Sequence, residues 1–342
     1  MTDSRSSLQF LAVGWFSTVM GLSGLALAWH RGAAQLGEPA IAVSVALAIL
    51  AAVVFATLLA ATAVRARRHP LALREDLQHP VRHAFVAAVP ISALLLVTLW
   101  VSLVGASPLV EAFWWLASLA QLAVTLWVLT RWWKGSQPGG LVWASITPAL
   151  IVPIVGNILV PLAGVPLGHL SSSAAQFGIG LLFWPVVLIL LLVRIAVAGL
   201  WPERMMPTIF IAIAPPAVIG MDALQFGAPP LVAWGAWGIA LFFLLWGLTQ
   251  ARRIAALEFG VAHWAMSFPL AAFTALTLRL AAPENGGGPV MGVLALFALA
   301  ATSVVVLGLV LGTVRGLRQG RLLVPEPAAT APQPAASGGQ SR

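Results

Sequence analysis

The segment TPALIVPIVGNILVPLAG, residues 147–164, holds three prolines and no charged residue. Proline removes a helix hydrogen bond and bends the helix axis. In hydrocarbon the freed carbonyl needs a partner, so such a helix is tolerated where protein or a water-filled cavity surrounds it. The segment therefore predicts a bent membrane helix that lies inside a bundle.

The composition of the whole chain excludes a water-soluble protein. Of its 342 residues 60% are hydrophobic and 8% are charged, and the mean hydropathy is +0.97; soluble domains carry about 25% charged residues. The chain has no cysteine, which excludes disulfides and Cys-ligated metals. Its net charge is +8. In a membrane protein such an excess of Lys and Arg usually lies in the cytoplasmic loops, so it does not indicate nucleic-acid binding.

Ten apolar runs have about the 20 residues that a helix needs to cross the bilayer. They lie at 11–29, 40–64, 84–104, 110–130, 141–163, 175–198, 207–224, 231–248, 262–280 and 290–314. With both termini in the cytoplasm, 16 of the 18 basic residues fall on the cytoplasmic side and only Arg31 and Arg279 fall outside. We therefore expect a multi-pass membrane protein, and the preference for arginine over lysine in the composition indicates a bacterial source and so the inner membrane.

Three parts of the chain follow from these spans. Residues 1–10 form a cytoplasmic tail, residues 11–318 form the membrane domain, and residues 319–342, rich in Pro, Ala, Ser and Gly, form a disordered cytoplasmic tail. The first span also fits a signal peptide with a cleavage site at Ala26-Leu27-Ala28. Against that alternative, small residues from Gly14 to Ala28 recur on one helix face, where they favour close packing of a retained helix.

Proline segregates into the odd-numbered spans. The prolines concerned are Pro90, Pro148, Pro153, Pro161, Pro215, Pro216 and Pro269, whereas the even-numbered spans contain only Pro185. This alternation predicts an all-α fold in which a helical hairpin is repeated five times, with the kinked odd-numbered helices inside and the straight ones outside. The alternative is that the prolines only adjust helix packing.

Short motifs over residues 11–318 carry a family resemblance. They are Val13-Gly14-Trp15-Phe16, His79-Pro80-Val81, Thr147-Pro148-Ala149, Ala214-Pro215-Pro216-Ala217 and Trp264-Ala265-Met266-Ser267-Phe268-Pro269. In order and spacing the chain resembles the tellurite-resistance/dicarboxylate transporter family (TehA-like), which includes the plant slow-type anion channels. The resemblance implies five hairpins around a central pore, assembly as a homotrimer, and small anions as the transported partners, with chloride, nitrate, sulfite and C4-dicarboxylates among them.

The resemblance also implies a gate. In the channel members of the family a phenylalanine of the ninth span plugs the pore, and the motif places it at Phe268. An aromatic ring across a narrow apolar pore blocks ions because they cannot keep their hydration there. Without the resemblance, Phe268 is one of 15 phenylalanines in an apolar protein.

Polar groups near the expected pore are few. Arg279 follows Phe268 by eleven residues, about three helical turns, and so shares its face; with Asp222 it marks the outer mouth. The alternative is a structural ion pair between Asp222 and Arg279. Further pore-lining candidates are Ser17, Thr18, Ser92, Thr147, Asn157 and Ser267, each of which could instead hydrogen-bond a neighbouring helix.

Two other functions compete with a channel. A carrier for C4-dicarboxylates or for sulfite- or tellurite-type oxyanions stays open, although Asp222 is the only carboxylate clearly inside a span, which argues against proton coupling. An intramembrane enzyme would need a nucleophile with its base or a metal cluster. His79 and His83 are four residues apart but have no third ligand in a basic loop. We therefore expect no enzyme, no cofactor and no metal, with anions and membrane lipid as the partners.

Overall fold

The computed structural model describes residues 8–135, 137 and 139–325, and over these ranges all regular secondary structure is helical, with no strand. The predicted all-α class is therefore confirmed. Most of the two predicted tails, residues 1–7 and 326–342, lies outside the described residues.

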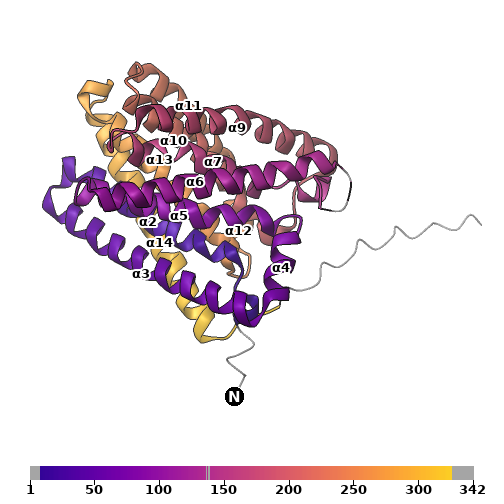
Figure 1. The fold of residues 1–342 in the computed structure, drawn as a ribbon. Coiled ribbons are helices and arrows are strands. Elements are labelled where there is room, and N and C mark those ends of the chain that lie inside the picture. Colours follow the sequence, from indigo (N-terminus) through magenta and orange to yellow (C-terminus); the bar gives the residue numbers. More distant parts are fainter. Residues whose placement is uncertain (1–7, 136, 138, 326–342) are drawn as a thin grey trace, which may run out of the picture.

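Eight helical stretches in the described part of the chain are long and apolar enough to cross a membrane. They are Glu38–Arg68, Arg82–Leu103, Pro108–Lys134, Leu170–Ala198, Glu203–Gln225, Pro230–Leu248, Val261–Leu280 and Pro289–Arg318. The two remaining expected spans fall on α2 (Ser17–Leu36) and on the interrupted segment Pro148–Gly164. Figure 1 shows the long helices running in one general direction along the molecule.

Burial divides these stretches into two sets. In the most apolar windows of Arg82–Leu103, Glu203–Gln225 and Val261–Leu280, 56, 83 and 78% of the residues are buried. The even-numbered stretches, which contain α3 (Glu38–Arg68), α6 (Pro108–Thr130), α9 (Leu170–Ala198), α11 (Pro230–Leu248) and α14 (Pro289–Arg318), have 17 to 33% of theirs buried. This difference is compatible with the predicted hairpins, whose odd-numbered members lie inside.

Each of the five inner spans begins as a 3-10 helix and continues as an α-helix. We call the point of change a junction. The five pairs are η2 (Val13–Phe16) with α2, η3 (Arg82–Ala87) with α5 (Ala88–Leu103), η6 (Pro148–Ile151) with α7 (Val152–Ile158), η7 (Glu203–Ile213) with α10 (Ala214–Gln225), and η8 (Val261–Met266) with α13 (Ser267–Leu280).

Five prolines of the inner spans lie at these junctions, within the first turn of an α-helix. Pro90, Pro153 and Pro269 fall within the first three residues of α5, α7 and α13, and Pro215 and Pro216 are the second and third residues of α10. The first N–H groups of an α-helix have no partner within that helix, so proline costs little there. Pro148 opens η6, and Pro161 opens the short helix α8 (Pro161–Gly164).

The small-residue face of α2 packs directly on α13. A Cβ built on Gly21 would overlap the side chain of Ser267, and one built on Gly24 would lie 3.0 Å from Cδ2 of Phe268. The close approach that the glycine pattern predicts is therefore present, and it fixes where the first turn of α13 lies. The first span is longer than its predicted end at residue 29, because α2 continues to Leu36 and ends at Gly37, whose φ is 71°.

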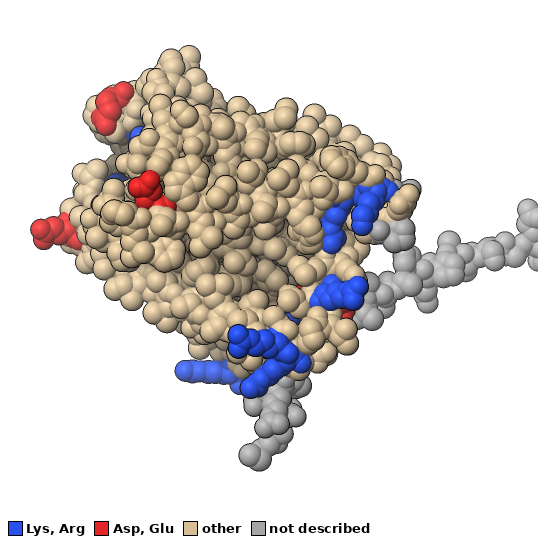
Figure 2. All heavy atoms as spheres, in the orientation of Figure 1, with Lys and Arg blue, Asp and Glu red and all other residues tan. Residues whose placement is uncertain are grey.

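Charged side chains separate to the two ends of the molecule. On the face of the molecule drawn in Figure 2, most of the Lys and Arg side chains lie at one end, and the Asp and Glu side chains lie mainly at the other. Arg65 does not belong to this exposed charge. It is 2% exposed and pairs at 2.7 Å with Asp76 of α4 (Pro70–Gln78), while its Nε donates to the carbonyl of Gln9.

Substituting Gly21 with alanine should destabilise the fold, because overpacking a close helix contact costs about 1–3 kcal/mol. The Gly308→Ala variant is the matched control: Gly308 also lies within a helix, and an added Cβ there would have no heavy atom within 4 Å. We expect the midpoint of thermal unfolding to fall for Gly21→Ala and to stay or rise slightly for Gly308→Ala. Equal midpoints for the two variants would contradict the packing of α2 on α13.

Substituting Asp76 with asparagine should also destabilise the protein strongly, by about 3–5 kcal/mol, because it leaves the buried Arg65 guanidinium without its counter-charge. The control is Glu75→Gln, which removes a pair with Arg82 in which the Glu75 side chain is 74% exposed and which is worth at most about 1 kcal/mol. Thermal unfolding of both variants measures the difference. A loss for Glu75→Gln as large as that for Asp76→Asn would refute the assignment of Arg65 to a structural pair.

Candidate functional site

The five junctions meet around a cavity of about 30 Å³. Its lining draws on every inner span and includes Ser17, Met20, Phe85, Val152, Val155, Ile211, Ala214, Trp264, Ala265, Phe268 and Pro269. About 10–15 Å³ of such volume holds one water molecule, so the space admits about two. The cavity is therefore too small for a hydrated ion.

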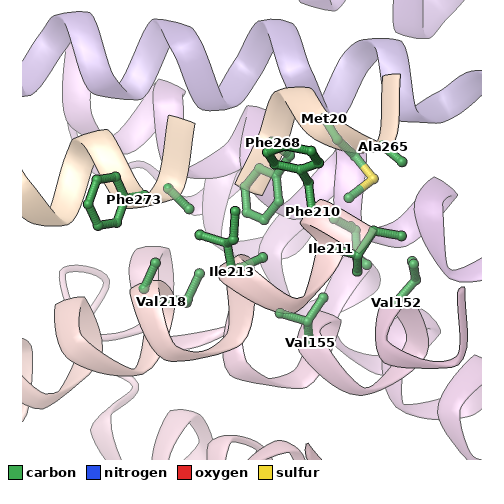
Figure 3. Close-up of a cluster of buried hydrophobic side chains, with 14 of the residues drawn as sticks. Met20, Val152, Val155, Phe210, Ile211, Ile213, Val218, Ala265, Phe268 and Phe273 are labelled. Carbon is green, nitrogen blue, oxygen red and sulfur yellow. The ribbon is translucent and has the colours of Figure 1, made fainter. Parts of the chain in front are cut away.

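Phe268 occupies the second position of α13 and is 5% exposed. One side of its ring lies against Gly24, where the absent side chain makes room for it. Figure 3 shows Phe268 and Met20 on one side of the buried cluster and Ile211 and Val155 on the other. These neighbours offer no hydrogen-bonding side chain, so the surroundings of the Phe268 ring are apolar on these sides.

Four of the six polar candidates bond to nearby carbonyls. Ser17 donates to the carbonyl of Gly14, Thr18 to that of Trp15, Ser92 to that of Ala88, and Ser267 to that of Trp264, at 2.6–2.8 Å. Of these four, Ser17 also lines the cavity. Thr147, just before η6, is buried and its hydroxyl has no hydrogen-bond partner among the described residues.

The remaining polar candidate, Asn157, is buried and faces the neighbouring helices. Its amide donates to Thr125 of α6 and to the carbonyl of Pro153, and its Oδ1 accepts from Gln176 of α9. Gln121 and Thr125 donate to the same Pro153 carbonyl, at 2.9 and 2.8 Å. This network ties α7 to α6 and α9.

Sequence reasoning missed the partners in this network. Ser118, Gln121 and Thr125 are spaced three and four residues apart on α6, which puts them on one helix face. That spacing was the available signal. It pointed to a polar seam between helices in an otherwise apolar segment.

The two candidate charges of the outer mouth lie near the C-terminal ends of α10 and α13. Asp222 is fully buried, and neither of its carboxylate oxygens has a hydrogen-bond partner among the described residues. Asp222 and Arg279 do not form the direct ion pair that the sequence left open, since no contact within 4 Å joins them in the described part of the chain. They interact electrostatically at longer range, and Arg31 of α2 interacts with Asp222 in the same way.

The two histidines considered as metal ligands serve the turn before η3. Nδ1 of His79 accepts from the backbone N–H groups of Val81 and Arg82, and Nδ1 of His83 lies 2.9 Å from the carbonyl of His79. Within the described ranges no group of three or more His, Cys, Asp or Glu side chains is placed to hold a metal ion.

Comparison with known proteins gives a consistent result. The family model described as voltage-dependent anion channel (SLAC1) matches residues 11–314. The tellurite resistance protein TehA homolog of Haemophilus influenzae is 26% identical over 325 residues, which cover 92% of this chain and 93% of the relative. The S-type anion channel SLAH2 of Arabidopsis thaliana is 27% identical over 240 residues, 70% of this chain, and the match spans 46% of the plant protein's length.

Proposed function

Because this chain belongs to the voltage-dependent anion channel (SLAC1) family of multi-pass membrane proteins, we propose that it conducts small anions along the axis of its five inner spans and that Phe268 is the gate. The observation that carries the proposal is the meeting of all five junctions around one small cavity beside the Phe268 ring. In this proposal anion movement is the function, and no enzymatic step takes part.

The barrier arises from dehydration. An anion that reaches the junction level meets Phe268, Met20, Val155 and Ile211, which cannot replace its hydration shell. Opening requires the Phe268 ring to leave the axis. Phe268 borders the cavity on one side, and on its other side the ring already lies against Gly24, so the cavity is the free space next to the ring.

The proposed orientation puts both termini and the basic end of the bundle in the cytoplasm of a bacterial cell. Arg67 and Arg68 at the end of α3 are exposed there, whereas Arg65 is neutralised by Asp76, so the positive potential that favours anions comes from the exposed arginines. Large apolar side chains on the outer helices, such as Leu182, Leu231 and Phe297, are 63, 79 and 71% exposed. They would contact lipid or the other protomers of a homotrimer.

The decisive experiment records anion currents of purified protein in planar bilayers. Phe268→Ala should raise the current in chloride, nitrate and malate by at least about tenfold, which corresponds to removing about 1.4 kcal/mol from the barrier. Phe273→Ala is the matched control. Phe273 lies on the same helix and is also 5% exposed, but it stacks on Trp237 of α11, at 5.9 Å between ring centroids, and does not line the cavity.

Two results would overturn the gate. Equal currents for wild type and Phe268→Ala would mean that the ring does not obstruct the path, and an equal rise in Phe273→Ala would mean that any lost core volume has the same effect. If no variant carries current while liposomes containing wild-type protein take up malate when a pH gradient is applied, the protein is a coupled carrier.

A further inference from the structure

Three charged side chains lie at the outer end of the inner spans, which we define as the end opposite the junctions. They are Arg31 of α2, Asp222 of α10 and Arg279 of α13, and we call them the charged triad. They are the only Asp, Glu, Lys or Arg residues in the α segments of the five inner spans. Arg279 follows Phe268 by eleven residues, or about 16 Å along the helix axis.

The triad is unusual because its members interact without touching. Asp222 has 0% exposure, and its two oxygens accept no hydrogen bond from a described residue. It interacts electrostatically with both arginines, and these repel each other. No described residue lies within 4 Å of either guanidinium as an ion-pair partner. A structural salt bridge would bring the charged atoms into direct contact, since desolvated charges are costly without it.

Charge decides what the triad can bind. Two guanidinium groups face at most one negative charge, on Asp222, so the triad carries a net positive charge and attracts anions. Arg31 and Arg279 are partly exposed, whereas Asp222 is buried beneath the surface. A solute from the outer side therefore reaches the donors before the carboxylate. Of the charges nearby, Glu284 also interacts with Arg279, and it lies in the following loop, in η9 (Pro283–Asn285).

We propose that Arg31 and Arg279 form an anion-binding site at the outer end, selective for oxyanions and carboxylates over halides, in which Asp222 is a built-in counter-ion. The place of this site on a conduction path rests on the proposed function, but binding itself does not. Guanidinium groups present a planar fork of donors that matches the paired oxygens of nitrate or a carboxylate. Asp222 opposes the bound anion and so keeps its release fast, as conduction requires.

Binding is measured on the purified full-length protein by titration calorimetry with nitrate, malate and chloride at constant ionic strength. Removing one guanidinium, in Arg31→Gln or Arg279→Gln, should weaken nitrate and malate binding about tenfold, because each loses a charge-assisted hydrogen bond. Asp222→Asn should tighten binding about tenfold by removing the opposing charge. Arg318→Gln is the matched control: it removes an exposed arginine from the last turn of α14, at the basic end, and should leave the affinity unchanged.

Unchanged affinity in both arginine variants would overturn the site, and so would equal binding of chloride and nitrate by the wild type. If Asp222→Asn does not fold, the two arginine variants decide the question alone. A triad that only holds the helices together would lower the thermal unfolding midpoint in all three variants without changing the anion affinity, which also overturns the proposal.

Calorimetry on Phe268→Ala separates this inference from the proposed function. The site predicts wild-type affinity in that variant, since Phe268 lies about 16 Å away along the helix. Intact binding without any anion current would refute the conduction proposal and leave the site standing. Current through Phe268→Ala, with arginine variants that bind like the wild type, would refute the site alone.

Discussion

The structure depends on how five helices change their hydrogen bonding inside a bilayer. At each junction the backbone switches from the 3-10 to the α pattern, and a carbonyl without a partner costs several kcal/mol in hydrocarbon. At two of these points a hydroxyl side chain adds a hydrogen bond to a carbonyl of the preceding 3-10 turn, Ser17 to Gly14 and Ser267 to Trp264, each at 2.6 Å. The outer helices lie between these junctions and the lipid. The five irregular segments meet at one level and leave only a small space between them.

The sequence predicted much of this arrangement, because proline and glycine report directly on backbone geometry. The odd and even spans were separable by proline, and the face of α2 that carries Gly21 and Gly24 was identifiable as a packing face. The junctions themselves were not predictable. Proline is compatible with a mid-helix kink and with the first turn of a helix, and only the tertiary structure distinguishes these two cases.

The positions of two side chains could not be predicted from the sequence alone. Asn157 is a polar residue in an apolar helix and fitted a pore lining equally well, but its partners Thr125 and Gln176 come from other spans, so its direction depends on contacts that no local pattern encodes. Arg31 was placed beyond the first span, because the predicted span ends at residue 29. The helix nevertheless continues to the positive-φ Gly37, a common C-terminal signal that would have extended the span.

Separating the constriction from the charges has a physical consequence. An apolar ring raises the barrier for every hydrated anion, and it discriminates between them mainly by how tightly they hold water. Discrimination by shape needs oriented donors, and the α segments of the inner spans carry charged donors only at their outer ends. A guanidinium beside Phe268 would bind the anion at the narrowest point and slow its departure. Placed about 16 Å away along α13, the proposed anion site would select an anion without holding it at the proposed gate.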